Sequence, residues 1–264
     1  MSVRLSVLAA LLPLLTLAAC DEGGRPAWKT EAAKAEAVAG YVKPPSVLAA
    51  RAGRGGTALA GVAAPGARVL LVAPDGGQKE ARADDKGAWM IVAPPATTLR
   101  LYGLAMMVGE RSVQAEGFLA LTPDGRLAQL RPGAGALVLS APSRRPRILA
   151  LDFDRDGAAM VSGVGTINAE VGLRLDRAAA GGSMIDRQGR FSFALSRPVS
   201  EAGHDLEISG EGGEDTISVT TSRPADLGGL YRASRLTGAW RIDWRTPGGG
   251  VQSTLLFDPA TGSR

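Results

Sequence analysis

The sequence predicts an all-β protein in which two tandem β-sandwiches follow a signal peptide and a flexible tether. Three observations lead to this fold class. Apolar side chains recur at every second position in short runs, which places them on one face of a strand. The runs end at turns rich in Gly, Asp and Pro, spaced about 8–12 residues apart. A block of sequence also recurs at a constant offset, since residues 58–91 match residues 160–193.

Residues 1–19 have the pattern of a signal peptide. Arg4 precedes an uncharged run from Leu5 to Cys20, which is shorter than the ~20 residues that a membrane-spanning helix needs. The run ends in Leu17-Ala18-Ala19-Cys20, which resembles the lipobox of bacterial lipoproteins. The resemblance implies cleavage before Cys20, acylation of its thiol, and lasting attachment to a membrane of the bacterial cell envelope, facing the periplasm. Asp21 resembles an inner-membrane retention signal, and the choice between inner and outer membrane stays open.

Residues 20–45 are interpreted as the acylated cysteine and a tether. They contain few large apolar side chains, as a linker does. A stretch rich in Ala, Glu and Lys at residues 30–39 is compatible with a short helix, which Gly40 and the Pro44-Pro45 pair would end.

The internal repeat defines two domains, at residues 46–141 and 148–264, with a short linker at residues 142–147. The shared offset extends upstream, where we align Val47 with Leu149 and Ala49 with Leu151. The corresponding positions within the repeat are Gly61/Gly163, Val62/Val164, Ala67/Ala169, Val69/Val171, Leu71/Leu173, Asp84/Asp186, Gly87/Gly189, Trp89/Phe191 and Ile91/Phe193.

The motif residues of the first repeat carry a family resemblance. The run from Gly61 to Val69, followed by Asp84, Gly87 and Trp89, resembles the bacterial immunoglobulin-like domains of surface and envelope proteins. The second repeat departs from the pattern, because Ile167-Asn168 stands at the Pro-Gly position. The resemblance implies an immunoglobulin-like sandwich for each repeat and transfers no catalytic residue.

Each repeat is followed by further strand-forming sequence. Residues 117–139 predict a hairpin around Pro123-Asp124-Gly125 with a second turn at Pro132-Gly133. Residues 236–257 predict a C-terminal hairpin that turns between Thr246 and Gly250.

The C-terminal hairpin contains the one candidate ligand surface. Trp240, Ile242 and Trp244 share a strand face. If this face is buried, it closes the second sandwich. If it is exposed, Trp240 and Trp244 are spaced to stack on sugar rings. Large aromatic residues at strand spacing are more often core residues, so the core interpretation is favoured.

Asp152, Asp154 and Asp156 form the D-x-D-x-D-G opening of a calcium loop. The bidentate Glu of the complete loop is missing, because Gly163 stands at its position. In the alternative interpretation, Asp152 and Asp154 face water on a strand and Asp156 begins a turn. We therefore assign no metal site and keep these three residues as a calcium candidate.

His204 is the only histidine, and its neighbour Asp205 suggests a search for a catalytic triad. The sequence has no G-x-S-x-G motif, and no serine is tied to His204 by spacing. We expect an exposed loop histidine and no catalytic residue.

Composition narrows the function. One cysteine excludes a disulfide scaffold and a thiolate zinc site, and the net charge of +4 without interleaved aromatic residues gives no sign of a nucleic-acid partner. We expect no cofactor and no enzyme activity. The favoured function is a lipid-anchored spacer or protein-interaction module of the envelope. The alternative is a glycan-binding module for peptidoglycan or exported polysaccharide.

Overall fold

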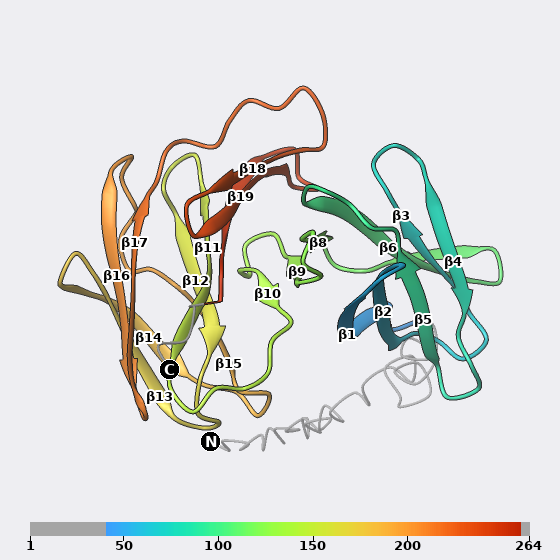
Figure 1. Ribbon diagram of the computed structural model, residues 1–264, viewed down its shortest axis with the longest axis horizontal. Coiled ribbons are helices and arrows are strands. Elements are labelled where there is room, and N and C mark those ends of the chain that lie inside the picture. Colours follow the sequence, from blue (N-terminus) through green and yellow to red (C-terminus); the bar gives the residue numbers. More distant parts are fainter. Residues whose placement is uncertain (1–40, 260–264) are drawn as a thin grey trace, which may run out of the picture. The chain divides into compact units, whose positions relative to one another are not determined.

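The computed structural model describes residues 41–259 (Figure 1). This part of the chain consists of β-strands joined by turns and loops, and every strand pairing in it is antiparallel. Within residues 41–259 there is no helix that is long and apolar enough to cross a membrane. The predicted signal peptide, the predicted lipobox with Cys20 and most of the predicted tether lie outside the described residues.

The first repeat forms a sandwich of two sheets. A three-stranded sheet has the order β1-β2-β5, and it faces a sheet in which β4, β3 and β6 are neighbours and β7 pairs with β6. Alternate residues of β2, β3 and β5, such as Leu59, Val69 and Ile91, are buried between the sheets. The strand bounds are β1 (Ser46–Gly53), β2 (Gly56–Val62), β3 (Arg68–Val72), β4 (Gln78–Arg82), β5 (Ala88–Ala93), β6 (Arg100–Val108) and β7 (Arg111–Gln114).

The second repeat forms a sandwich with the same strand order. Strands β11, β12 and β15 are neighbours in one sheet, and the facing sheet has the order β14-β13-β16-β17. Three-stranded and four-stranded layers with these connections are those of an immunoglobulin-like sandwich, so the predicted fold class is confirmed. The strand bounds are β11 (Arg147–Asp154), β12 (Ala159–Val164), β13 (Glu170–Leu175), β14 (Ala178–Met184), β15 (Arg190–Ala194), β16 (Gly203–Gly210) and β17 (Gly213–Thr220).

The turn before the fifth strand of each sandwich has the same hydrogen bonds in both repeats. The Asp84 carboxylate accepts the N–H groups of Lys86 and Ala88, each at 2.8 Å. The Asp186 carboxylate accepts the equivalent N–H groups two and four residues later, at 2.8 and 2.9 Å. Gly87 and Gly189 close these turns with φ of 82° and 75°, which explains their recurrence in the sequence.

The upstream alignment is wrong by one residue. Val47 pairs with Gly61, and Ile148 pairs with Gly163, so Val47 corresponds to Ile148 and not to Leu149. A β-bulge follows each of these residues, and the extra residue of the bulge is Leu48 in the first repeat and Leu149 in the second. A constant offset missed this shift because the hairpin loop after the first strand differs in length between the repeats.

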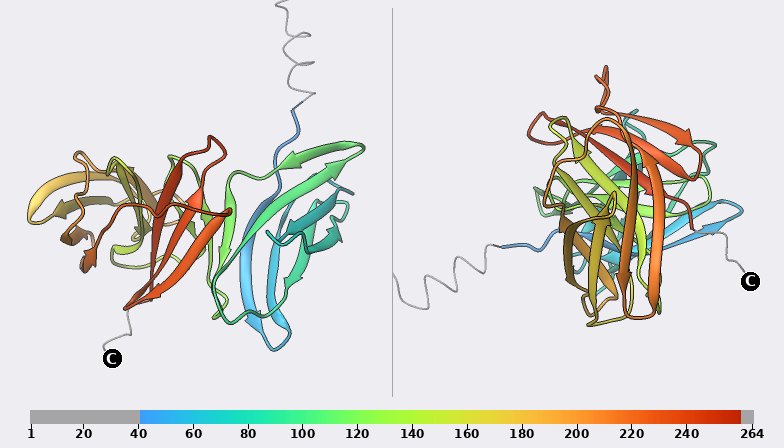
Figure 2. Two further views of the ribbon diagram at one scale, coloured as in Figure 1. Left: turned by 90° about the horizontal axis from the view of Figure 1, so that it is seen from above. Right: turned by 90° about the vertical axis from the view of Figure 1, so that its left-hand side faces the viewer.

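Each sandwich is extended by further strands (Figure 2). The first extension adds β8, β9 and β10 beside β6, and the second adds β20, β19 and β18 beside β11. Residues of both extensions share one hydrophobic core with Ala150 of β11, and this core includes Leu130, Ile242 and Trp244. The strand bounds are β8 (Phe118–Leu121), β9 (Leu127–Leu130), β10 (Leu137–Val138), β18 (Tyr231–Leu236), β19 (Ala239–Arg245) and β20 (Val251–Phe257).

The sheet that contains β11 and β20 therefore has a core on each face. Leu151 and Phe153 point to the interior of the second sandwich, whereas Ala150 and Leu256 point to the core that the two extensions share. Burial on both faces explains why β20 is buried at nearly every position instead of at alternate ones.

Candidate functional site

The outer face of the second sandwich is covered by residues 131–138, which we call the covering segment. The Ser192 hydroxyl of β15 donates to the Ala134 carbonyl at 2.9 Å, and the Ala136 N–H donates to the Asp152 carboxylate at 2.7 Å. The segment lies so close to the sheet that a Cβ atom on Gly135 would be 2.6 Å from Ser192 Oγ. Side chain and backbone contacts thus fix this segment on the sheet.

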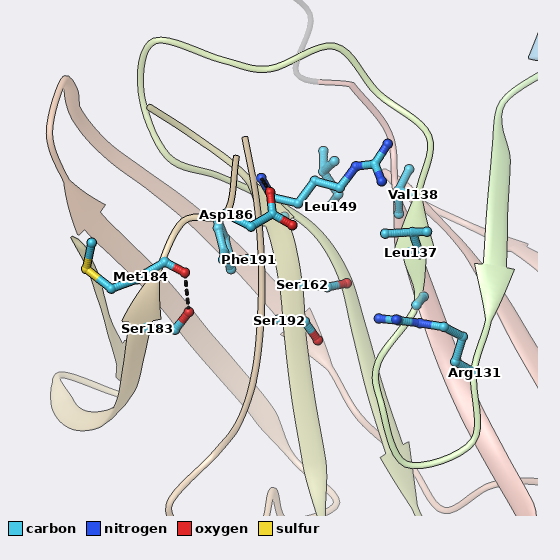
Figure 3. Close-up of a pocket in the computed structure, with 13 residues that line it drawn as sticks. Arg131, Leu137, Val138, Leu149, Ser162, Ser183, Met184, Asp186, Phe191 and Ser192 are labelled. Atoms are coloured by element: carbon cyan, nitrogen blue, oxygen red, sulfur yellow. Dashed lines mark hydrogen bonds between the residues drawn. The ribbon is translucent and has the colours of Figure 1, made fainter. Parts of the chain in front are cut away.

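A cavity of about 300 Å³ lies beside the covering segment, and we call it the repeat-two cavity. In Figure 3, Arg131 and Leu137 of the covering segment lie on one side of it and Met184, at the end of β14, lies on the other. The sheet residues Ser162 and Ser192 lie between them. The full lining is Arg131, Ala136, Leu137, Val138, Leu149, Ser162, Gly163, Ser183, Met184, Asp186, Arg190, Phe191 and Ser192.

Two polar atoms in the lining of this cavity have no hydrogen-bond partner among residues 41–259. Ser162 is 3% exposed and its Oγ is one of them, and the other is Nε of Arg190. A buried polar atom that lacks a partner costs about 1–3 kcal/mol, so such atoms are few in folded proteins. Their presence together on one cavity marks it as a candidate binding site.

Sequence reasoning missed both residues, although the repeat contains a signal for them. At the offset of the repeat, Ser162 stands where the first repeat has Ala60, and Arg190 stands where it has Ala88. Polar residues that replace alanine at outward-facing strand positions could have been recognised as specific to the second repeat.

No segment of residues 41–259 covers the equivalent face of the first sandwich, and we call it the open face. It contains three exposed large apolar side chains, since the exposed fractions of Leu48, Met90 and Val92 are 63%, 64% and 47%, and one charged residue, Arg51. Ala58 and Ala60 of β2 pair with Val92 and Met90 and complete the surface. Clustered apolar side chains on a solvent-facing sheet are typical of interaction sites.

The two tryptophans do not form a stacking surface for sugars. Trp244 is fully buried, its ring meets Phe118 edge-on at 6.1 Å, and its Nε1–H donates to the Thr254 hydroxyl at 3.1 Å. Trp240 is half-buried beneath the Arg235 guanidinium, which lies 5.6 Å from the ring centroid. The core interpretation is therefore correct, except that these residues close the core between the two extensions and not the interior of the second sandwich.

The three aspartates of the calcium candidate have different partners. Asp152 was expected to face water, but it is completely buried and accepts hydrogen bonds from the Ala136 N–H and the Thr254 hydroxyl. Asp154 caps its own turn by accepting the N–H groups of Asp156 and Ala158 at 2.9 and 3.0 Å. No group of three His, Cys, Asp or Glu side chains in residues 41–259 is arranged to hold a metal ion.

The expectation that His204 is an exposed loop residue is wrong. It lies on β16, is 8% exposed, and its Nδ1 is 2.8 Å from the Asp176 carboxylate. Its Nε2 is 3.0 Å from the Ser200 carbonyl oxygen and 3.3 Å from the Ser200 hydroxyl. The structure thus brings together a serine, a histidine and an aspartate that sequence spacing did not connect.

This trio is arranged as a structural ion pair and not as a catalytic triad. Burial alone lowers the pKa of His204, but hydrogen bonds to Asp176 and to the Ser200 carbonyl outweigh it and raise the pKa. The Asp205 N–H and the His204 ring hold the pKa of Asp176 below its ordinary value. When His204 is protonated, both ring nitrogens donate, to the Asp176 carboxylate and the Ser200 carbonyl, and the ring has no lone pair to take a proton from Ser200.

Comparisons with known proteins gave similarities of fold only. No family model and no curated protein sequence matches the chain. A solved structure of a biofilm-associated protein, its BSP domain, is 14% identical with a TM-score of 0.25, over 70% of this chain and 30% of that one. The central fibronectin-III array of RIM-binding protein is 9% identical with a TM-score of 0.24, over 79% and 74%. Invasin, a bacterial integrin-binding protein, is 10% identical with a TM-score of 0.23, over 81% and 54%.

Proposed function

We propose that this protein is a lipid-anchored, non-enzymatic module of the bacterial cell envelope that binds a partner protein through the open face. The observation that carries the proposal is the contrast between the two repeats. The same sheet face that the covering segment occupies in the second sandwich is solvent-exposed and apolar in the first, at Leu48, Met90 and Val92.

The second repeat also indicates what kind of partner fits. Its face holds a turn that leads into the short strand β10, and the residues there are small or apolar, Gly133-Ala134-Gly135-Ala136-Leu137. The open face lacks the anchors Ser192 and Asp152, because Met90 and Arg51 stand at these positions. We therefore propose that the partner contributes an apolar segment rich in small residues that is held by side-chain packing, with few polar anchors.

Site-specific photocrosslinking in cells tests this proposal. A photoreactive residue at Met90 should crosslink one envelope protein, and mass spectrometry should place the crosslink in an apolar segment. The same residue at Lys79, exposed on β4, is the matched control and should give no such product. Val92→Lys in the Met90 variant should abolish the product, because it places a charge in the apolar surface. Crosslinking only to a second copy of this chain, or equal yields at Met90 and Lys79, would contradict the proposal.

The lipid anchor is a separate part of the proposal and rests on the lipobox sequence that ends at Cys20. An acylated Cys20 followed by the tether would hold both sandwiches at a distance from the membrane, as a spacer does. The wild-type chain should incorporate labelled palmitate and fractionate with membranes. Cys20→Ser should lose both properties, and a labelled, membrane-bound Cys20→Ser chain would exclude the lipobox interpretation.

A further inference from the structure

We propose that the repeat-two cavity binds a small monocarboxylate with a short apolar tail, held by Arg190 and Ser162. This site is independent of the open face and of the lipid anchor. It lies on the second repeat, between the covering segment and strands β12, β14 and β15.

The polar groups of the cavity select a negatively charged acceptor. Nε of Arg190 is a donor without a partner among residues 41–259, and the hydroxyl of Ser162, on the neighbouring strand and in the same lining, is likewise unpaired. A carboxylate has two acceptor oxygens, so it can accept one hydrogen bond from each residue. Guanidinium groups bind carboxylates through charge-assisted hydrogen bonds, which are about twice as strong as neutral ones.

The charges of the cavity favour a single negative charge over a dianion such as phosphate. Arg131 and Arg190 contribute two positive charges, and Asp186 contributes one negative charge. Arg131 already donates its Nε and Nη2 to the carbonyl oxygens of Gly135 and Ala134, both at 3.0 Å, so its main role is to hold the covering segment. The net formal charge of +1 in the lining (two arginines minus one aspartate) matches one carboxylate.

Besides Ser183, Ser192 and Gly163, the remaining lining consists of apolar residues that can contact a short apolar tail on the ligand. It comprises Ala136, Leu137, Val138, Leu149, Met184 and Phe191. Leu149 reaches the cavity because it is the extra residue of the bulge in β11. A cavity of about 300 Å³ is at the small end of ligand sites, so it suits a tail of a few carbon atoms.

The scaffold of the site is shared by both repeats, whereas its chemistry belongs to the second. The Asp186 turn fixes the main chain of Arg190 through the bond from its N–H to the Asp186 carboxylate at 2.9 Å. The Asp84 turn fixes Ala88 in the same way, at 2.8 Å. The first repeat has Ala88 and Ala60 at the positions of Arg190 and Ser162. The variants Arg190→Ala and Ser162→Ala therefore introduce residues that the same scaffold already contains in the first repeat.

Calorimetric titration of the purified full chain tests the proposal with three probes. N-acetyl-leucine represents a peptide carboxyl terminus, hexanoate represents a free short-chain acid, and N-acetyl-leucinamide is the uncharged match of the first probe. At least one of the two acids should bind with a Kd at or below about 1 mM, and the amide should bind at least about tenfold more weakly. The stronger of the two acids identifies the source of the carboxylate.

The variants decide whether binding occurs at this cavity. Arg190→Ala should weaken binding about tenfold or more, and Ser162→Ala should weaken it about threefold, each with an unchanged near-UV circular dichroism spectrum. Arg187→Ala removes an exposed charge from the same turn and should leave the affinity unchanged. The proposal is overturned if neither acid binds, if the amide binds as tightly as the acid, or if Arg190→Ala and Arg187→Ala have equal effects.

Discussion

Gly61 and Gly163 occupy the same position in the two sandwiches, where the strands approach too closely for any side chain. A Cβ atom on Gly61 would lie 1.9 Å from the Ser46 carbonyl oxygen, and one on Gly163 would lie 2.0 Å from the Arg147 carbonyl oxygen. In each case the ring of the paired aromatic residue fills the remaining space, at 2.7 and 2.5 Å. The conservation of glycine between the repeats therefore has a steric cause.

Gly163→Ala should destabilise the protein by about 2–3 kcal/mol, because the new methyl group overlaps backbone that cannot move without breaking strand pairing. Gly172→Ala is the matched control, since a Cβ atom on Gly172 meets nothing within 4 Å. Urea denaturation followed by circular dichroism measures both. Equal free energies of unfolding for the two variants would show that the close approach at Gly163 is absent.

The covering segment should be sensitive to a side chain at Gly135. Gly133 and Gly135 both have positive φ, at 67° and 73°, but only a Cβ atom on Gly135 would meet the sheet, at 2.6 Å from Ser192 Oγ. Gly133→Ala should cost about 1 kcal/mol from backbone strain alone. Gly135→Ala should cost about 1–2 kcal/mol more and should speed amide hydrogen exchange at Ala136. Equal free energies of unfolding for Gly133→Ala and Gly135→Ala, together with equal exchange rates at Ala136, would indicate that the segment does not contact the sheet.

Burial of Asp152 should make the protein less stable as pH rises. Complete burial raises the pKa of Asp152 from 3.8 to about 6, although hydrogen bonds from Thr254 and Ala136 act in the opposite direction. The folded state therefore binds the proton more tightly than the unfolded state does. The free energy of unfolding therefore decreases as pH rises from about 4 to about 6, and the decrease is complete above the folded-state pKa of Asp152. The rise of the Asp152 pKa from 3.8 to about 6 corresponds to a loss of about 3 kcal/mol at most in the free energy of unfolding.

Asp152→Asn should flatten this dependence, because the amide does not ionise and retains an acceptor for the Ala136 N–H. The measurement is the free energy of unfolding of the wild type minus that of the variant, at pH 4.5 and pH 7.5. Asp156→Asn, at an exposed position in the same segment, should leave the wild-type pH profile unchanged. A difference between wild type and Asp152→Asn that does not vary with pH would contradict the assignment.

The His204–Asp176 pair should stabilise the protein over a limited pH range. The raised pKa of His204 means that its contribution is complete below the ordinary value of 6.5 and is lost as pH rises through the folded-state pKa. The lowered pKa of Asp176 means that its contribution is lost as pH falls through that value. Because Asp176 is half-exposed, we expect His204→Gln to cost about 1 kcal/mol at pH 6.

At a pH above the folded-state pKa of the ring, the same substitution should cost less, since His204 is then neutral. Denaturation of His204→Gln at both pH values measures this, and the titration of the ring protons by NMR gives the pKa directly. A ring pKa below 6.5 would refute the raised value. Hydrolysis of a model ester that disappears in His204→Gln would refute the structural role assigned to Ser200, His204 and Asp176.

Much of the fold could be predicted from local patterns. Three of these patterns depend only on neighbouring residues within one repeat. They are the alternation at Val69 and Leu71, the turns at Asp84 and Asp186, and the match between Gly61 and Gly163. Asn168 illustrates the same point, because it stands at the position of Gly66 and has φ of 61° where Gly66 has 71°. Asparagine tolerates this conformation better than other non-glycine residues do.

The candidate sites were harder to predict, because they depend on contacts between residues far apart in the sequence. His204 looked like an exposed loop residue because Asp176 and Ser200 reach it from other segments. Asp152 looked like a calcium ligand because its partners Ala136 and Thr254 lie on either side of it in the sequence, outside its own loop. A spacing pattern contains no information about such partners.

The sequence by itself determined the two repeats, the strand faces and the turns, because backbone conformation and side-chain alternation are decided over a few residues. It also contains the run Leu17-Ala18-Ala19-Cys20, which resembles a lipobox and lies outside the described residues. Only the tertiary structure decided which sheet faces are covered. The covering segment and the core around Trp244 bury one face of the second repeat, whereas Leu48, Met90 and Val92 remain exposed on the first. The two repeats have nearly the same local pattern, but the face is covered and contains a cavity in one repeat and is open in the other. The difference arises because burial depends on which other segments of the chain pack on that face.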